Sequence, residues 1–461
     1  MSKATEETTE RARRAYDRSQ SDEELREAFL AGDLPVAVYG LGKMGLPVAA
    51  VFADVCGNVT GVDVDESVVA AVSAGECPVE GGTDLPVLVS KVVQEDALSA
   101  TSDVASAATD ATVHVLLATT SLDGDEPDLS ALERSLREVA TGLAPGDVVF
   151  VESTVPPRTT ENAIAPALAE LSGLDPGTFG VAACPERTAS GNAVADVRGS
   201  YPKIVGGVDA ESTRVARVVY DALTSNEVVT TTDAATAETA KVIEGVYRHV
   251  TVALANELAT YSRALDVDVT EAISVANTQP QCELHDRRPG VGTHCAPVYP
   301  HFITGAFDVD APLVRTARTV NERMPAYAVA LLEAMLDEHG VGDGPPTILL
   351  LGLASRGNVA ERRNAPGATV AEKLASCGAR VVAVDPLVDD WDAPERVARA
   401  SLDELDDEDI GRGVDAVAVL ADHDEFAAVD WTNLDAPVLD GRDVVPEDSS
   451  ATVYAIGGRW P

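Results

Sequence analysis

The stretch that decides the fold is Pro35–Asp63, PVAVYGLGKMGLPVAAVFADVCGNVTGVD. Its first apolar run, residues 36–39, is typical of a strand that is buried on both faces of a parallel sheet. Three glycines follow this run, at Gly40, Gly42 and Gly45. A helical segment and a second strand complete the stretch, which therefore predicts the first unit of a doubly wound α/β sheet.

The spacing of these glycines predicts a dinucleotide cofactor. The first glycine allows a tight turn, the second lets a pyrophosphate approach the backbone, and the third lets helix and strand pack closely. The second strand ends at Asp63, 23 positions after Gly40, where a carboxylate hydrogen-bonds the ribose 2′-hydroxyl and repels a 2′-phosphate. NAD is therefore favoured over NADP. Glycines that serve only close packing are the less favoured alternative.

Strand and helix patterns alternate after this stretch, give way to a helical segment, and then resume. One long helix is expected from about residue 233 to 265, because apolar residues recur there every four positions, at Val242, Val246, Val250, Leu254 and Leu258. We expect four parts: a charged helical extension (1–33), an NAD-binding domain (34–232), a helical central domain with a cysteine loop (233–340) and a second, Rossmann-like domain (341–461). The central helix is expected to carry a homodimer interface, although a buried core helix would show the same pattern.

The 461-residue chain has a formal net charge of −42, and only six of its basic residues are lysines. A field of this sign repels nucleic acid and anionic membranes. At 1 M salt the Debye length is about 3 Å, which makes such self-repulsion tolerable. We therefore hypothesise a halophilic protein, and a melting temperature that is highest in dilute buffer would contradict this.

The sequence favours a cytoplasmic location. No apolar run approaches the ~20 residues of a membrane span, and the charged first residues lack the apolar region of a secretory signal. Six cysteines are scattered without paired spacing, which in a cytoplasmic protein indicates free thiols.

The loop Gly290–Phe302, GVGTHCAPVYPHF, raises the question of what Cys295 does. A thiolate is a strong nucleophile that forms a hydrolysable acyl intermediate. A metal site with Cys282, His285 and His294 is disfavoured, because adjacent His and Cys side chains rarely converge on one tetrahedral ion. A simple buried cysteine is the other alternative.

From about Pro35 onward the chain resembles the UDP-glucose / UDP-N-acetylmannosamine 6-dehydrogenases, which are nucleotide-sugar dehydrogenases. The resemblance rests on the order and spacing of motifs such as GLGKMG, ESTVPPRTT, CPERTASG, PKIVGG, AKVIEGVYRHVTVALANELA, GVGTHCAPVYPHF, ARTVNERMP, LLGLASRGNVAERRNAP and ADHDEF. It implies that the C6 alcohol of a UDP-sugar is oxidised to a carboxylate with two NAD, through a cysteine thiohemiacetal and thioester. It also implies an NAD domain, a helical dimerising middle and a UDP-binding C-terminal domain.

The resemblance assigns chemistry to four residues. Cys295 stands at the position of the family's nucleophile, and Lys241 at that of the lysine whose ammonium stabilises alkoxides and oxyanions. Glu186 matches a glutamate suited to act as general base on the thioester, and Thr154 matches a threonine that helps to hold the hydrolytic water. A structural salt bridge is the alternative for Glu186.

Further residues are expected to bind the cofactor and the substrate. Thr120 and Glu152 follow predicted strands and are expected to face the NAD crevice. The uridine diphosphate needs cations, and Arg suits bidentate contacts with phosphate. The substrate-binding residues implied by the resemblance are Arg318, Asn321, Arg356 and Arg363. No metal is expected.

Two residues depart from the family pattern. Gly245 stands one helical turn after the lysine, where Asn is common, and Tyr299 stands four residues after the cysteine, where Asp is common. Losing one oxyanion donor can cost about 10²–10³ in rate. UDP-N-acetyl-D-mannosamine is the favoured substrate. The alternatives are a UDP-glucose dehydrogenase, a non-catalytic nucleotide-sugar-binding paralogue and, least favoured, a two-electron hydroxyacid dehydrogenase.

Overall fold

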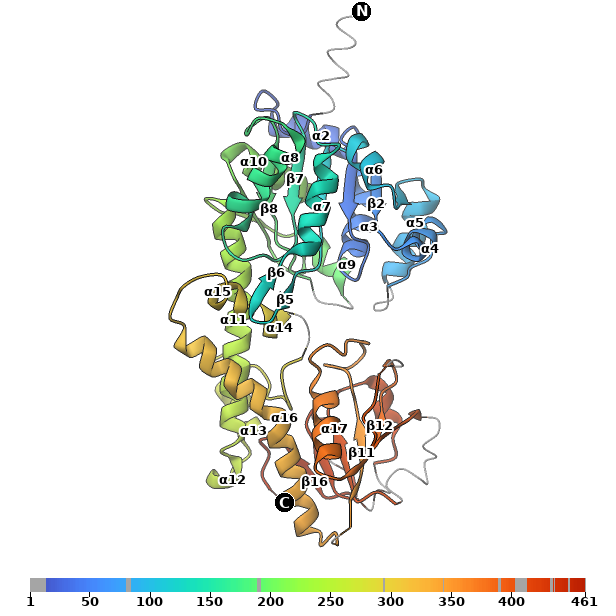
Figure 1. Cartoon of the computed structure of the whole chain (residues 1–461), viewed down its shortest axis with the longest axis vertical. Helices are drawn as coiled ribbons and strands as arrows, with labels where there is room; N and C mark the ends of the chain where they lie inside the picture. Colours follow the sequence, from blue (N-terminus) through green and yellow to red (C-terminus); the bar gives the residue numbers. More distant parts are fainter. Residues whose placement is uncertain are drawn as a thin grey trace, which may run out of the picture. The chain divides into compact units, whose positions relative to one another are not determined.

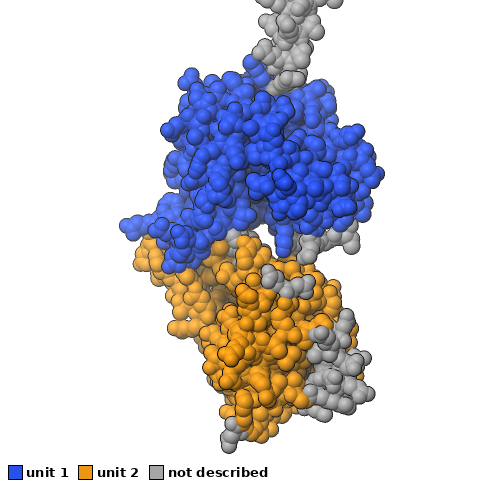
Figure 2. Space-filling view, turned by 45° about the vertical axis from the view of Figure 1, so that its right-hand side comes forward, with its two compact units in different colours: residues 1–244, 301–308 blue, residues 245–300, 309–461 orange. Residues whose placement is uncertain are grey.

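The computed structural model describes residues 14–79, 84–188, 192–292, 295–342, 344–388, 391–402, 413–431, 434, 436–446 and 448–460, without the side chains of Cys295 and Ala296. The chain divides into two compact units, shown in different colours in Figure 2. Unit 1 comprises residues 1–244 and 301–308, and unit 2 comprises residues 245–300 and 309–461.

Unit 1 is built on an eight-stranded sheet in the order β10-β9-β8-β7-β4-β1-β2-β3. Its strands are β1 (Val36–Tyr39), β2 (Val59–Val62), β3 (Leu98–Thr101), β4 (Val113–Leu116), β7 (Val148–Val151), β8 (Gly180–Ala183), β9 (Lys203–Gly207) and β10 (Val228–Thr230). β1 lies between β2 and β4 and runs parallel to both. All its residues are buried, as the uninterrupted apolar run predicted.

Helices cover both faces of this sheet. One face packs against α2 (Asp22–Leu30), α3 (Gly45–Cys56), α5 (Asp84–Gln94) and α10 (Ala210–Leu223). The other face packs against α6 (Val104–Asp110), α7 (Ser130–Ala140) and α8 (Ala165–Ser172). The remaining elements of this unit include α4 (Glu66–Ser73), the hairpin strands β5 (Ser121–Asp123) and β6 (Glu126–Asp128), and α15 (His301–Thr304). The unit is therefore a three-layer α/β structure.

The described part of the N-terminal segment is integrated into unit 1. Helix α2 begins with a capping box between Ser21 and Glu24, an arrangement that satisfies two backbone donors at the start of a helix. Its Leu25 and Phe29 are fully buried in the core, and the helix lies beside α10 (Figure 1). The sequence predicted helical character here, and the structure adds that the helix contributes to the hydrophobic core.

Unit 2 contains a six-stranded sheet in the order β13-β12-β11-β14-β15-β16, in which every pair is parallel. Its strands are β11 (Thr347–Leu351), β12 (Arg380–Val384), β13 (Val397–Ala400), β14 (Ala416–Val419), β15 (Val438–Asp440) and β16 (Val453–Ala455). Its helices include α12 (Ser262–Leu265), α13 (Val269–Ala276), α14 (Cys295–Val298), α16 (Pro312–Glu338) and α17 (Pro366–Ser376). The predicted fold class, two α/β sheets separated in sequence by long helices, is confirmed.

Two details of the sequence expectation are corrected. The first sheet is not parallel throughout, because β9 runs antiparallel to β8. The described residues of their connection form only the three-residue α9 (Ala193–Ala195) and a π-helical turn, and parallel neighbours are usually joined by a full crossover helix. The long helix, α11 (Ala234–Ala259), ends at Ala259, and Leu254 of its predicted apolar stripe is 47% exposed.

The glycine turn after β1 has the tight geometry that its sequence predicts. Gly40 adopts φ +97°, which favours glycine, and its N–H donates to Val62 O at 2.8 Å. A β-carbon at Gly45 would lie 1.7 Å from Gly40 O, whereas one at Gly42 would meet no atom within 4 Å. Gly45 thus serves helix–turn packing, and Gly42 leaves open space beside the turn.

Replacing these two glycines with alanine should separate folding from cofactor binding. Gly45→Ala should destabilise the protein by about 1–3 kcal/mol or more, as overpacking typically does. Gly42→Ala should keep the wild-type melting temperature but weaken NAD binding, because its methyl group occupies the space that a pyrophosphate needs. Thermal unfolding and NAD titration by fluorescence check both variants. Equal melting temperatures would contradict the packing role of Gly45.

Candidate functional site

The carboxyl ends of β1 and β2 form a cradle that fits a dinucleotide. Asp63 Oδ2 accepts the N–H of Leu41 in the glycine turn at 2.7 Å, and Asp63 Oδ1 accepts the N–H of Asp65 at 3.0 Å. The carboxylate is half-buried. Open space at Gly42 and an acid at the end of the second strand are what a pyrophosphate and a ribose require. The predicted Gly40, Gly42, Gly45 and Asp63 are thus brought together.

Three further strands end at the same edge of the sheet and carry the other predicted residues of unit 1. Thr120, after β4, is buried and donates its hydroxyl to Thr154 O, after β7, at 2.9 Å. The N–H of Glu186, after β8, donates to Glu152 O at 3.1 Å. Parallel strands deliver their following residues to one edge, so these four residues lie in one region.

Glu186 and Lys241 lie close enough to interact electrostatically. Burial raises the pKa of the Glu186 carboxyl, and the Lys241 ammonium on α11 opposes that shift. The N–H of Thr188 also donates to this carboxylate, and a hydrogen bond from the Thr188 side chain lowers its pKa. A carboxyl with a raised pKa is a stronger base than an exposed one, which is a property that a general base needs.

Glu152 is held in a buried polar cluster at this edge. Its side chain is 2% exposed and accepts from Lys203 Nζ at 2.9 Å and from the Tyr220 hydroxyl. The same ammonium lies 4.4 Å from the centre of the Tyr220 ring. Burial raises the pKa of the neighbouring Cys184 thiol. The Glu152 carboxylate is therefore bonded within the protein interior, and its hydrogen bonds connect the end of β7 to β9 and α10.

Glu238 on α11 is a residue of this region that sequence reasoning missed. It is 1% exposed and accepts the N–H groups of Arg158 at 2.6 Å and Thr160 at 2.7 Å. Burial raises its pKa to about 7, although these hydrogen bonds lower it. Arg158 has φ +73°, so Glu238 fixes a strained turn of the loop that begins at Thr154. The sequence signal was its place three residues before Lys241.

The turn after β11 in unit 2 repeats the turn after β1. Gly352 has φ +99°, and its N–H donates to Val384 O at 2.8 Å. Asp385, after β12, accepts the N–H groups of Leu353 at 2.7 Å and Ala354 at 2.8 Å.

Asp385 differs from Asp63 because it also bonds to a histidine. His423 Nε2 lies 3.2 Å from Asp385 Oδ2, and neither side chain is exposed. Burial alone would raise the pKa of Asp385, but His423 and the backbone N–H groups outweigh it and lower the pKa. With its oxygens occupied inside the protein, this carboxylate is not arranged to receive a ribose.

The predicted substrate-binding residues fall in different environments of unit 2. Arg356 follows the β11 turn, and Arg363 pairs with Glu361 at 2.9 Å on the surface. Arg318 pairs with Glu322 at 2.6 Å on α16. Asn321 is buried and bridges two helices, since its Oδ1 accepts from Asn256 Nδ2 at 2.9 Å and its Nδ2 donates to His249 O at 3.1 Å. Its described hydrogen bonds connect α16 to α11.

A group of cations in unit 2 was not predicted. Burial lowers the pKa of Arg288, and the guanidinium groups of Arg442 and Arg248 lower it further. The Arg288 Nε is buried without a hydrogen-bond partner among the described residues. Arg442 bonds to Asp422 at 2.6 Å, beside the β11 turn. Cations crowd together here in a chain of net charge −42, which is a signal for an anionic ligand. The only sequence hint was the dipeptide Arg287–Arg288 near the cysteine loop.

The side chain of Cys295 and all of His294 lie outside the described residues. The helix that starts at Cys295, α14, belongs to unit 2. Within the described part of the chain, no three His, Cys, Asp or Glu side chains are placed to hold a metal ion. In the same described part, no helix is long and apolar enough to cross a membrane.

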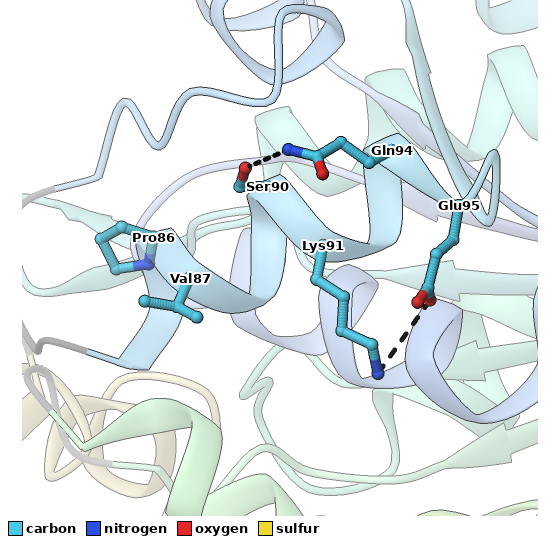
Figure 3. A pocket seen from close by; sticks show the side chains of 6 residues that line it. All are labelled: Pro86, Val87, Ser90, Lys91, Gln94 and Glu95. Carbon is cyan, nitrogen blue, oxygen red and sulfur yellow. Dashed lines mark hydrogen bonds and ion pairs between the residues drawn. The ribbon is translucent and has the colours of Figure 1, made fainter.

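An open surface depression in unit 1 lies apart from these residues. It is lined by Pro86, Val87, Ser90, Lys91, Gln94 and Glu95 (Figure 3). All six belong to α5 or directly follow it, and Lys91 forms ion pairs with Asp54 and Glu95. A depression bounded by one helix offers no converging polar groups, so we assign it no role.

The whole plan of the chain matches one family of known proteins. Residues 34–224, 235–323 and 349–447 match, respectively, the NAD binding domain, the central domain and the UDP binding domain of the UDP-glucose/GDP-mannose dehydrogenase family. The Asp63 cradle lies in the first of these segments. The Asp385 turn and Arg442 lie in the third.

Individual relatives are similar over almost their whole length. The chain is 34% identical over 430 residues to UDP-N-acetyl-D-mannosamine dehydrogenase from Pyrococcus horikoshii, covering 92% of this chain and 99% of that protein. A structure titled UDP-D-ManNAc dehydrogenase from the same organism has a TM-score of 0.84 at 33% identity, covering 92% of this chain and 99% of that chain. The structure of a UDP-glucose dehydrogenase from Pyrobaculum islandicum has a TM-score of 0.82 at 26% identity. The match covers 93% of this chain and 98% of that chain.

The Glu152 cluster gives a stability prediction. Lys203→Met should cost about 3–5 kcal/mol, because it leaves a buried carboxylate without its counter-charge. Adding Glu152→Gln should recover most of that loss. Urea unfolding measures the effect.

The matched control for this prediction is Lys91→Met. It breaks a surface pair with Asp54, which should cost at most about 1 kcal/mol. If Lys203→Met were no more destabilising than this control, the Lys203–Glu152 pair would not stabilise the region.

Proposed function

This chain belongs to the UDP-glucose/GDP-mannose dehydrogenase family, and from that premise we propose that it oxidises the C6 alcohol of UDP-N-acetyl-D-mannosamine to the uronic acid. The chain is an NAD-dependent nucleotide-sugar dehydrogenase. The single observation that carries the substrate proposal is its 34% identity, over 92% of the chain, to a relative named for that activity. The structures that follow the same plan support the same class of reaction.

The cofactor is NAD, and the cradle after β1 is suited to it. We propose that the backbone at Gly40, Gly42 and Gly45 holds the pyrophosphate and that Asp63 bonds the adenosine ribose. Thr120 and Glu152 are proposed to complete the crevice. The carboxylate of Glu152 is already bonded to Lys203, so we propose that Glu152 contributes through its position after β7 and not through its carboxylate. NAD, when bound, accepts the hydride of each of the two oxidations.

The first part of the proposed reaction makes an aldehyde and captures it. The Lys241 ammonium stabilises the negative charge that develops on the C6 oxygen as its proton leaves. The Cys295 thiolate then forms a bond to the aldehyde carbon, and the oxygen takes up a proton to give a thiohemiacetal. Oxidation of this adduct leaves a thioester on Cys295. The aldehyde is never released.

The second part hydrolyses the thioester. We propose that Thr154 orients a water and that Glu186 removes its proton as the water attacks the acyl carbon. The carbon–sulfur bond breaks, Cys295 leaves as thiolate, and the product is a carboxylate. The raised pKa of Glu186 beside Lys241 supports this assignment, because a general base works best when its pKa is close to the working pH.

The diphosphate is proposed to be held by arginines of unit 2. Arg356 and Arg363 flank the β11 turn in sequence, and Arg318 lies on α16. The crowded cations Arg288 and Arg442 are further candidates, because an anion there would relieve their mutual repulsion. Asn321 is proposed to act by holding α16 to α11 through its described hydrogen bonds.

We propose a homodimer formed through the central helix. In unit 2, α11 and the residues after it expose large apolar side chains at Tyr247, Leu254, Tyr261 and Leu265, each more than 40% exposed. The first three recur every seven residues, the spacing at which two helices pack along a seam. A monomeric mass in sedimentation equilibrium would contradict the proposal.

The remaining proposals concern the chain as a whole. We propose a central helical domain over residues 233–340, flanked by domains over 34–232 and 341–461. We also propose that the protein is cytoplasmic and adapted to high salt. The net charge of −42 supports adaptation to high salt.

Purified protein in molar KCl should form two NADH per molecule of UDP-N-acetyl-D-mannosamine consumed. The two oxidations on one carbon require this ratio. Absorbance at the NADH band measures it, with UDP-glucose, UDP-galactose and UDP-N-acetylglucosamine as parallel substrates. Faster turnover of UDP-glucose would contradict the proposed substrate and identify UDP-glucose in its place. Tight UDP-sugar binding without NADH formation would favour a non-catalytic paralogue.

Glu186→Gln should trap the thioester. We expect a burst of two NADH per active site, then turnover slowed by about 10²–10⁴, the contribution of a general base. Mass spectrometry should find an acyl adduct on Cys295. Glu211→Gln is the control, because Glu211 is another buried glutamate of unit 1 that pairs with Arg214. Wild-type turnover in Glu186→Gln would remove Glu186 from the mechanism.

A further inference from the structure

Gly245 lies inside the long helix α11 (Ala234–Ala259), where glycine is less favourable than alanine. Its φ is not in the left-handed region, so the helix backbone does not require it. The reason is steric. A β-carbon at position 245 would lie 2.2 Å from Tyr299 Cδ2 and 2.9 Å from both Cβ and Cγ of Tyr299. The Tyr299 side chain therefore occupies the space that any other residue at 245 would need.

Tyr299 directly follows α14 (Cys295–Val298), the helix that begins at the proposed nucleophile. This helix has four residues, and Pro297 within it lacks a backbone N–H, so its own hydrogen bonds stabilise it little. Its end is instead packed into the protein, with Val298 5% exposed and Tyr299 6% exposed. The contact between Tyr299 and Gly245 lies entirely within unit 2.

We propose that Tyr299 is a positioning residue for the nucleophile, and that Gly245 is present to admit its ring. Seated on the backbone of α11, the ring fixes the end of α14 and thereby the start of that helix, Cys295, four residues earlier. This inference rests on the proposed role of Cys295. It also explains the two departures from the family pattern, Gly245 and Tyr299, together. A side chain at position 245 would clash with Tyr299 in its present position, so the two residues depend on each other.

The proposal predicts energetic coupling between the two positions. Gly245→Ala should push the ring aside and move α14, and a misplacement of about 1 Å can lower the rate by ~10²-fold. The loss should appear in kcat with little change in KM, because neither residue is among those proposed to hold the diphosphate. In a Tyr299→Ala background the same Gly245→Ala change should have a much smaller effect, because the contacts with Cδ2 and Cγ are gone and only the Cβ contact at 2.9 Å remains. Tyr299→Phe keeps the ring that contacts Gly245, so it should retain most of the activity that Tyr299→Ala loses.

The test uses the full-length chain in molar KCl and two readouts. The first is NADH formation with UDP-N-acetyl-D-mannosamine. The second is the alkylation rate of Cys295 by iodoacetamide, measured by mass spectrometry of its peptide, which needs no substrate. Gly245→Ala should change that rate about tenfold, because moving α14 changes the surroundings on which the reactivity of the thiol depends. The control is Gly342→Ala, since a β-carbon at Gly342 would meet no atom within 4 Å.

The outcomes separate this inference from the proposed function. If wild-type protein forms no NADH with any UDP-sugar, the proposed function fails, while alkylation still tests the Tyr299–Gly245 contact. Coupled effects in both readouts, with rescue by Tyr299→Phe, support the proposal. It is overturned if Gly245→Ala matches the Gly342→Ala control, if the effects of the two positions are independent, or if Tyr299→Phe is as impaired as Tyr299→Ala.

Discussion

The interaction on which the rest of the structure depends is a hydrogen bond from a backbone turn to a carboxylate on the neighbouring strand. In unit 1 the Leu41 N–H donates to Asp63, and in unit 2 the Leu353 N–H donates to Asp385, both at 2.7 Å. Each turn begins at a glycine with φ close to +100°. The bond ties the turn after the first strand to the carboxyl end of the neighbouring strand. The two sheets differ because His423 engages Asp385, whereas Asp63 stays half-exposed. One turn geometry therefore leaves a partly exposed carboxylate in unit 1 and a carboxylate closed off by a histidine in unit 2.

Carboxylates inside an acidic chain need cations, and this chain has few lysines. Two of its six lysines, Lys203 and Lys241, lie beside carboxylates at the carboxyl edge of the first sheet. Lys203 neutralises Glu152, while Lys241 limits the rise in the pKa of Glu186. Glu238 has no such cation in its described contacts and is held by backbone N–H groups instead, which fits its pKa of about 7. The region thus holds two buried glutamates, Glu186 and Glu238, and burial raises the pKa of both.

Gly245 and Tyr299 illustrate how two apparent defects become one feature. In the sequence they are 54 positions apart and each looks like the loss of a polar group. In the structure the Tyr299 side chain fills the space above Gly245. A change at one position therefore changes what the other can accept, so the two must be considered together. The contact also gives the short helix that begins at Cys295 a fixed support on a long one.

The sequence by itself determined the parts that depend on neighbours along the chain. Strand–glycine turn–helix–strand order, with Asp63 at its end, predicted the first sheet and NAD, because these contacts form within about thirty residues. The sequence also led us to expect Thr120 and Glu152, which follow strands, at the NAD crevice. Only the tertiary structure decided what each side chain does there. It turned Glu152 toward Lys203, placed Asn321 between two helices, set β9 antiparallel to β8 and crowded Arg288 with Arg442. Those pairings join residues that are distant along the chain, and packing between whole elements, not local backbone preference, selects them.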